Sequence, residues 1–175
     1  MMKKGFVLLL ILTLLSAPAL AYNPDAVVDD AGLLSSSQET ELENTLAALY
    51  ETYDFQVVLH TTEDTGYRDL AMYAADFYDE NGYGWGSGYD GLILVVDMDA
   101  REYVTVTTGS GMALFSDYDI GWIENAMLED LSAGYYARAF QTYLTYAERF
   151  LKNGGNAYYY SNTYDSYEDD DFDFE

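Results

Sequence analysis

Apolar residues recur three and four positions apart in four segments of the chain, which is the spacing of one face of an α-helix. These segments predict helices at about Ser36–Glu51, Arg68–Glu80, Asp117–Leu131 and Tyr135–Lys152. The first helix has two candidate starts, because Ser35 with Gln38 and Ser36 with Glu39 both have the spacing of a capping box. Each helix therefore has one face to bury.

Short β-branched and apolar runs lie between these helices and are typical of buried strands. Phe55–Thr61 predicts one strand, and Leu92–Val96 and Tyr103–Thr107 predict two more. The connection at Asp97–Arg101 is too short for a parallel return, so the last two strands form an antiparallel hairpin. The predicted fold class is α/β, with a mixed sheet flanked by about four helices in a three-layer sandwich.

A glycine-rich stretch, NGYGWGSGYDG, precedes the second strand and contains G-x-G-x-x-G at Gly86, Gly88 and Gly91. A dinucleotide-binding loop of this pattern follows a strand and opens a helix. Here a predicted helix precedes the glycines and a strand follows them. The stretch is therefore interpreted as a flexible connector.

The two ends of the chain differ from its centre. Two lysines, the apolar run Phe6–Leu15 and the small residues of Ala19–Ala21 are typical of an export signal. We therefore expect a signal segment over 1–21, a globular domain over 22–153 and an acidic, tyrosine-rich tail over 154–175 that is disordered when free. This organisation predicts a secreted or cell-envelope protein, attached to a membrane only if the signal segment stays uncleaved.

Charge narrows the choice of partners. Without the signal segment the chain has five basic and 31 acidic residues, a net charge of −26. Such a chain repels nucleic acid and anionic lipid, whereas multivalent cations or a cationic surface are attracted to it. The chain has no cysteine, which excludes disulfides and a thiol nucleophile. A protein or envelope partner is therefore expected.

The residues that match common catalytic patterns are better explained by structural roles. The single histidine, His60, ends a predicted buried strand and is interpreted as structural. Asp97 and Asp99 form a D-x-D pattern of the kind that aspartyl phosphatases use, but a second strand follows at once, so we interpret Asp97–Arg101 as a hairpin turn. No G-x-S-x-G or zinc-ligand spacing occurs.

A divalent-cation site with oxygen ligands remains as the candidate functional site. The antiparallel hairpin places Asp90 at the same end of the sheet as Gly109 and Gly111, with Asp117 shortly after them. Carboxylates with glycine carbonyl oxygens favour a hard divalent cation, calcium or magnesium. The alternative is that Asp117 and Asp119 only favour the positive end of the third helix.

These features together resemble the TPM domain family, over about Val27–Asn153. The motifs that carry the resemblance keep the family's order and spacing. They are VVDDAGLLS from Val27, DGLILVV from Asp90, TTG from Thr107 with Ser116-Asp117, and LSAGYY from Leu131.

The resemblance implies a mixed sheet flanked by helices, an exported or lumenal location, divalent-cation binding and, in some members, acid phosphatase activity. It also implies a metal site built from Asp29, Asp90 and Asp117. The chain departs from the family pattern in having Met112 and Ala113 where many members have an acidic residue, and an acidic tail where many have a membrane helix.

Three functions stay open. The first is a calcium-modulated binding or assembly module outside the cytoplasm. The second is a metal-assisted phosphatase in which the same carboxylates hold the ion. The third is a structural surface protein with neither ion nor pocket. Whether the chain is an enzyme is therefore undecided by the sequence.

Overall fold

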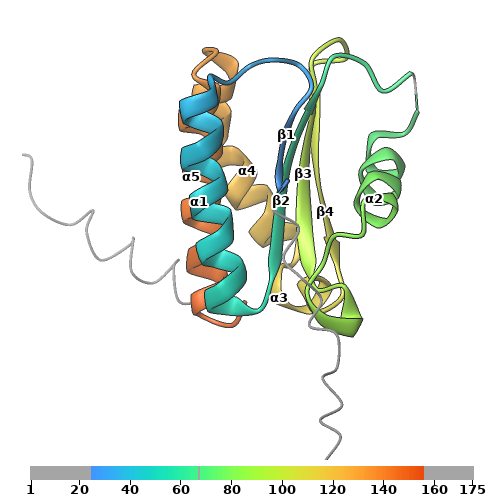
Figure 1. Cartoon of the computed structure of the whole chain (residues 1–175), viewed down its shortest axis with the longest axis vertical. Helices are drawn as coiled ribbons and strands as arrows, with labels where there is room; N and C mark the ends of the chain where they lie inside the picture. The colour runs from blue at the N-terminus through green and yellow to red at the C-terminus, as the bar shows by residue number, and fades with distance from the viewer. Residues whose placement is uncertain (1–24, 67, 156–175) are drawn as a thin grey trace, which may run out of the picture.

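A computed structural model describes residues 25–66 and 68–155 as three layers (Figure 1). A four-stranded sheet forms the middle layer. Helices α1 (Ser36–Tyr53), α4 (Asp117–Ser132) and α5 (Tyr136–Lys152) lie on one face, and α2 (Leu70–Glu80) lies on the other. The predicted signal segment and acidic tail lie outside the described residues.

The sheet has the strand order β1-β2-β3-β4. Its strands are β1 (Val27–Asp29), β2 (Gln56–Thr62), β3 (Gly91–Asp97) and β4 (Glu102–Thr108). The first three strands are parallel, whereas β3 and β4 form the expected antiparallel hairpin, with Gly91 opposite Thr108. In Figure 1 the parallel strands begin at the lower end and finish at the upper end.

Each face of the sheet buries its own apolar cluster, because side chains alternate along a strand. Val57, Leu92 and Leu94 face the three-helix layer and pack with residues of α1, α4 and α5. Val58 and Ile93 face α2. Both central strands are buried along their whole length, as expected of strands covered on both faces.

The predicted helices and hairpin are confirmed, and each of their ends lies within two residues of its predicted position. Helix α1 begins after Ser35, whose backbone N–H donates to Gln38 Oε1 at 2.9 Å, so the first of the two candidate capping boxes is used. Leu42, Leu46 and Leu49 are buried on the inward face of this helix. The fold class is thus the predicted α/β mixed sheet between helical layers.

The sequence analysis missed three short elements. They are β1, the 3-10 turn η1 (Gly86–Gly88) and the helix α3 (Gly111–Leu114). Three or four residues are too few to show a period. Among the described residues no helix is long and apolar enough to span a bilayer.

Strand β1 also fixes an unusual topology. The strands β1, β2 and β3 follow in chain order across the sheet, while α1 and α2 cover opposite faces. The two parallel crossovers therefore have opposite hands, and one departs from the usual right-handed rule.

Candidate functional site

Two glycine-rich loops meet at the lower end of the sheet, where β2 and β3 begin. The first runs from Asn81 to Asp90 and contains η1, and the second joins β4 to α4 through α3. Asp90 connects them, because its Oδ1 accepts a hydrogen bond from the backbone N–H of Ser110 at 2.6 Å. The lower end is therefore a loop surface fixed by a carboxylate.

The backbone of Asp90 adds three further bonds. It exchanges hydrogen bonds with Trp85 in both directions at 3.0 Å, and its carbonyl oxygen accepts from Gln56 N–H at 3.1 Å. The glycine-rich stretch thus closes on itself next to the first residue of β2. What the sequence suggests as a flexible connector is a hydrogen-bonded loop.

Gly109 allows the two loops to approach closely. Its φ is +56°, and an added Cβ would lie 2.5 Å from Gly88 O and 2.9 Å from Asp90 Cα. The carbonyl oxygen of Gly88 and the carboxylate of Asp90 therefore both face this glycine. Only glycine accommodates such an approach together with a left-handed backbone.

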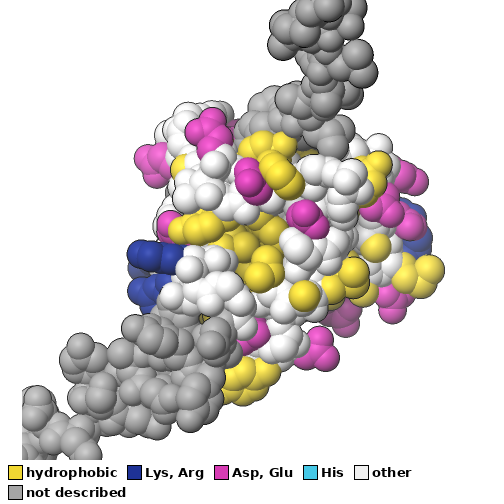
Figure 2. All heavy atoms as spheres, turned by 90° about the horizontal axis from the view of Figure 1, so that it is seen from below, with side chains coloured by type: hydrophobic (Ala, Val, Ile, Leu, Met, Phe, Trp, Pro, Cys, Tyr) yellow, Lys and Arg dark blue, Asp and Glu magenta, His cyan; other side chains and the backbone are white. Residues whose placement is uncertain are grey.

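Large hydrophobic side chains project into solvent from these loops and from the first turn of α4. Tyr89 is 56% exposed, and Met112 and Tyr118 are each 69% exposed. Trp85, at the start of η1, is half-buried. Seen from below, hydrophobic side chains gather in the middle of this face, with acidic side chains on most sides of them and Lys or Arg side chains at the left edge (Figure 2).

Asp117 lies at the start of α4 and is exposed, whereas Asp119 caps the helix. Asp119 Oδ2 accepts from the backbone N–H of Ser116 at 2.9 Å and from its hydroxyl at 2.6 Å. This reciprocal capping box explains why an acidic residue stands in the first turn. The alternative interpretation of these aspartates as helix-end residues therefore accounts for Asp119.

Asp29 does not join Asp90, so the three predicted carboxylates do not form a single site. Asp29 pairs with Thr61 at the upper end of β2, whereas Gly91, which follows Asp90, pairs with Gln56 at the lower end. Thr61 lies five residues after Gln56, which at about 3.3 Å per residue separates the two ends by roughly 16 Å. The parallel direction of β1, which the sequence did not reveal, causes this separation.

The carboxylate of Asp29 has a structural task instead. It accepts hydrogen bonds from the backbone N–H groups of Leu33 at 3.0 Å and Leu34 at 2.8 Å, and from the hydroxyl of Thr61. It therefore fixes the turn between β1 and α1. Among residues 25–66 and 68–155, no group of three or more His, Asp or Glu side chains is placed to hold a metal ion.

Three buried polar atoms lack a hydrogen-bond partner in the described part of the chain. They are Gln56 Nε2, the Tyr78 hydroxyl and Asp119 Oδ1. Gln56 is the first residue of β2, Tyr78 lies under Gly91, and Asp119 is in the first turn of α4. The unsatisfied polar groups thus gather toward the lower end of the fold.

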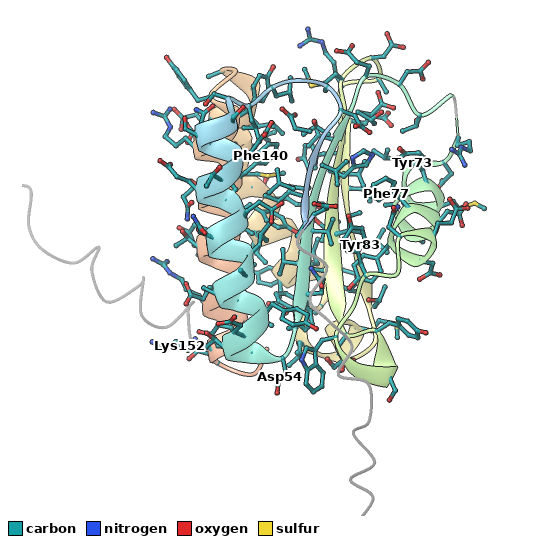
Figure 3. The ribbon with its side chains drawn as sticks, in the orientation of Figure 1. Asp54, Tyr73, Phe77, Tyr83, Phe140 and Lys152 are labelled. Carbon is teal, nitrogen blue, oxygen red and sulfur yellow. The ribbon has the colours of Figure 1, made fainter. Side chains whose placement is uncertain are left out.

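His60 is structural, as its position in a strand indicated. Its Nδ1 faces Val28 O at 3.1 Å, so this nitrogen carries the proton and Nε2 accepts from the Tyr73 hydroxyl at 2.9 Å. The imidazole stacks on Phe77 with ring centroids 4.1 Å apart, and Figure 3 shows Tyr73 and Phe77 between α2 and the sheet. Burial lowers the pKa of His60, and the hydrogen bond to Val28 and the charge of Asp30 offset this only in part.

Asp97 and Asp99 form the hairpin turn that the sequence predicts. Asp97 Oδ1 accepts from the backbone N–H groups of Asp99 and Ala100 at 3.0 Å, and Oδ2 accepts from Thr65 Oγ1 at 2.7 Å. Burial raises the pKa of Asp97, but these hydrogen bonds outweigh burial and hold it below its ordinary value. A carboxylate so fully engaged is a turn-forming group and is not free to attack phosphorus.

Two cavities at other places in the fold are acidic. One of 260 Å³ lies between the loop after β2 and the hairpin turn, where Arg68 stands among Asp64, Asp97, Asp99 and Glu102. The other, of 490 Å³, lies beside β1 and is lined by four carboxylates and the rings of Phe77 and Tyr83. Burial, with the charges of Asp25 and Glu43, raises the pKa of Tyr83 to about 12. Neither cavity offers a favourable field for phosphate.

Comparison with known proteins gives a consistent result. A family model described as the TPM domain matches residues 27–150. The chain is 35% identical over 132 residues to the UPF0603 protein YdjH of Bacillus subtilis (strain 168), which covers 74% of this chain and 50% of that protein. The chain therefore spans about half the length of this relative.

Solved structures of similar fold include proteins from three bacteria. The N-terminal domain of a protein from P. gingivalis has a TM-score of 0.67 and 23% identity, covering 77% of this chain and 87% of that one. The N-terminal domain of the cg2496 protein from Corynebacterium glutamicum has a TM-score of 0.57 and 19% identity, covering 81% of this chain and 84% of that one. The BA42 protein from Bizionia argentinensis has a TM-score of 0.58 and 15% identity, covering 69% of this chain and 83% of that one. At these identities the likeness concerns the fold.

Proposed function

Because this chain belongs to the TPM domain family, we propose that it is an exported, calcium-modulated binding or assembly module that acts outside the cytoplasm. The observation that carries the proposal is the lower end itself. There Asp90 holds two glycine-rich loops together through Ser110, and the same loops expose large side chains. A surface of this kind suits recognition of a partner better than chemical conversion of a substrate.

Calcium would act on this surface at Asp90 rather than at the carboxylate trio. The carboxylate of Asp90 and the carbonyl oxygen of Gly88 both face Gly109, and hard oxygen donors of these two types suit calcium or magnesium. One carboxylate with backbone oxygens makes a weak site. Extracellular calcium sites function with dissociation constants of about 0.1 to 1 mM, so a weak site can still fill outside a cell.

The bonds of Asp90 explain how an ion could alter binding. The carboxylate restrains Ser110, and Ser110 lies two residues before the exposed Met112. An ion on the same carboxylate would change how firmly the two loops are joined. The ion would thus modulate a surface without taking part in a reaction.

Three of the four arginines in the described chain argue against the phosphatase alternative. Arg68 lies among four carboxylates and over the ring of Tyr73, with 5.0 Å from its Cζ to the ring centroid. Arg138 forms an ion pair with Asp130, and Arg149 lies over Tyr146. Phosphoryl transfer needs positive groups that converge on one phosphate, and these arginines are engaged on separate elements.

Thermal melting of the mature chain with and without millimolar calcium tests the proposal. An ion at ten times its dissociation constant should stabilise the fold by about 1.4 kcal/mol, which is roughly 5 °C for a domain of about 130 residues. Asp90→Asn should abolish the shift while leaving the calcium-free domain as stable as the parent, because asparagine can still accept from Ser110. Asp76→Asn, an exposed substitution of equal charge on α2, is the matched control.

The outcomes separate the functions. A calcium shift that depends on Asp90 and not on Asp76 supports the module. An equal shift in both variants would mean that calcium acts only through the net charge of the protein. Hydrolysis of a phosphomonoester by the parent, lost in Asp90→Asn, would instead favour the phosphatase.

A further inference from the structure

Four side chains of the lower end have no part in holding the loops together. They are Trp85, Tyr89, Met112 and Tyr118, which we call the aromatic end. Three of them are among the six large hydrophobic residues that the described chain leaves most exposed. Trp85 and Tyr89 flank η1 in the first loop, Met112 is in α3, and Tyr118 is in the first turn of α4.

Backbone contacts bring these stretches together. Trp85 and Asp90 pair as an isolated β-bridge, and the hydroxyl of Thr108 donates to the carbonyl oxygen of Tyr89. Ser110, two residues before Met112, donates to Asp90. The two loops that carry Trp85, Tyr89 and Met112 are therefore held at fixed places on the fold, and Tyr118 follows them in the first turn of α4.

The composition of these loops resembles that of antibody paratopes. Residues 81–91 are all asparagine, glycine, tyrosine, tryptophan, serine or aspartate. Tyrosine and tryptophan provide large contact areas with few rotatable bonds, while glycine and serine give access to the backbone. Tyrosine and tryptophan often dominate the binding energy of protein interfaces when they lie at the centre of a contact.

The charge around the aromatic end indicates the chemistry of the partner. Asp54, Asp90 and Asp117 lie at the lower end, and in Figure 2 acidic side chains lie on most sides of the exposed hydrophobic ones, with Lys or Arg side chains only at the left edge. Lys152, the last residue of α5, lies at the same end, on the side of the three-helix layer (Figure 3). An aromatic centre with an acidic rim complements a surface that carries both apolar and basic groups.

We propose that the aromatic end docks a basic segment of a partner protein, in which lysine or arginine side chains alternate with apolar ones. This inference rests on the proposed binding function and adds the place and the partner's chemistry. A second copy of the chain is a poorer occupant, because two surfaces of the same negative charge repel. An anionic bilayer is a poorer one for the same reason.

The test uses the mature chain, residues 22–175, and a fluorescently labelled synthetic peptide of alternating lysine and leucine. Fluorescence anisotropy gives the dissociation constant. The double variant Tyr89→Ser, Tyr118→Ser should weaken binding at least about tenfold, because aromatic residues at the centre of an interface are often worth 1 to 2 kcal/mol each. Neither substitution alters the charge of the protein, so a change in affinity reports the surface itself.

The matched control is the double variant Met72→Ser, Tyr135→Ser. Met72 is 66% exposed on α2 and Tyr135 is 58% exposed before α5, so the control removes a similar exposed area elsewhere. It should bind the peptide within about twofold of the parent. Melting curves of both variants confirm that each is folded.

Two results would overturn the inference. Equal affinities of both double variants would show that the peptide responds only to net charge. Binding of the parent to uncharged phosphatidylcholine vesicles, lost in Tyr89→Ser, Tyr118→Ser and not displaced by the peptide, would assign the aromatic end to a membrane.

The same titration in EDTA separates this inference from the calcium proposal. Suppose that the peptide binds in EDTA and that binding requires Tyr89 and Tyr118. This result supports the docking surface, even if calcium leaves the melting temperature unchanged. A calcium shift that depends on Asp90, with peptide binding indifferent to the two tyrosines, keeps the calcium site and removes the docking surface.

Discussion

Replacing Gly91 by alanine tests the closest approach between β2 and β3. Gly91 is the first residue of β3 and pairs with Gln56 on one side and Thr108 on the other. A Cβ at this position would overlap the carbonyl oxygen of Gln56 and the hydroxyl of Tyr78. The first obstacle is backbone in a paired strand, so it cannot move aside by changing a rotamer.

The size of the effect follows from that geometry. Adding a methyl group to a close-packed position costs about 1 to 3 kcal/mol, and a backbone obstacle places Gly91→Ala in the upper part of this range. With an unfolding entropy of about 2.1 cal/mol/K per residue, a loss of about 2 to 3 kcal/mol lowers the melting temperature of a 130-residue domain by roughly 7 to 11 °C.

Differential scanning calorimetry of residues 22–175 measures this shift, and Gly121→Ala is the control. Gly121 lies inside α4, and a Cβ there would meet nothing within 4 Å. Alanine in a helix interior is favoured over glycine by about 0.5 to 1 kcal/mol, so this variant should melt roughly 2 to 4 °C higher. Equal melting temperatures for Gly91→Ala and the parent would refute the register of β2 against β3.

Two further predictions concern buried polar groups. Tyr78→Phe should leave the free energy of unfolding unchanged or raise it, because the hydroxyl that it removes has no hydrogen-bond partner. Tyr143→Phe should lower the free energy of unfolding by about 1 kcal/mol, because it loses the 3.1 Å hydrogen bond to Thr105. Equal effects of the two variants in urea titrations would contradict the assignment of the Tyr78 hydroxyl as unpaired. Burial lowers the pKa of His60 in the folded state. Neutral His60 therefore contributes its full stability above the pKa of the unfolded chain, about 6.5. This stability should be lost as the pH falls from about 6.5 through the lower folded-state pKa. The slope should be absent in His60→Gln, and an identical slope in that variant would assign it to carboxylates.

The predicted site shows where reasoning from sequence succeeds and fails. Asp90 and the glycines after β4 were placed together correctly, because a short hairpin forces both to one end of the sheet. Asp29 was grouped with them through family resemblance, but its position depends on the direction of β1. A three-residue strand has no periodicity of its own and exists only through its pairing with β2.

The aromatic end escaped the sequence analysis for a related reason. Tyrosine and tryptophan in a glycine-rich stretch can be buried or exposed, and the pattern does not separate the two. Tyr83 is 2% exposed and Tyr89 is 56% exposed, although only six positions separate them. Tyr83 is covered because its hydroxyl reaches Asp25 O, a contact made across the fold.

The sequence by itself determined the helices, the hairpin and the absence of disulfides. These follow from local periods, from a short connection and from composition, each of which acts over a few residues. The tertiary structure alone decided which face each helix covers, the opposite hands of the two crossovers and the separation of Asp29 from Asp90. Those features depend on pairing between distant segments. The free energy of such pairing depends on the contacts between the two segments, so neither segment's sequence alone determines it.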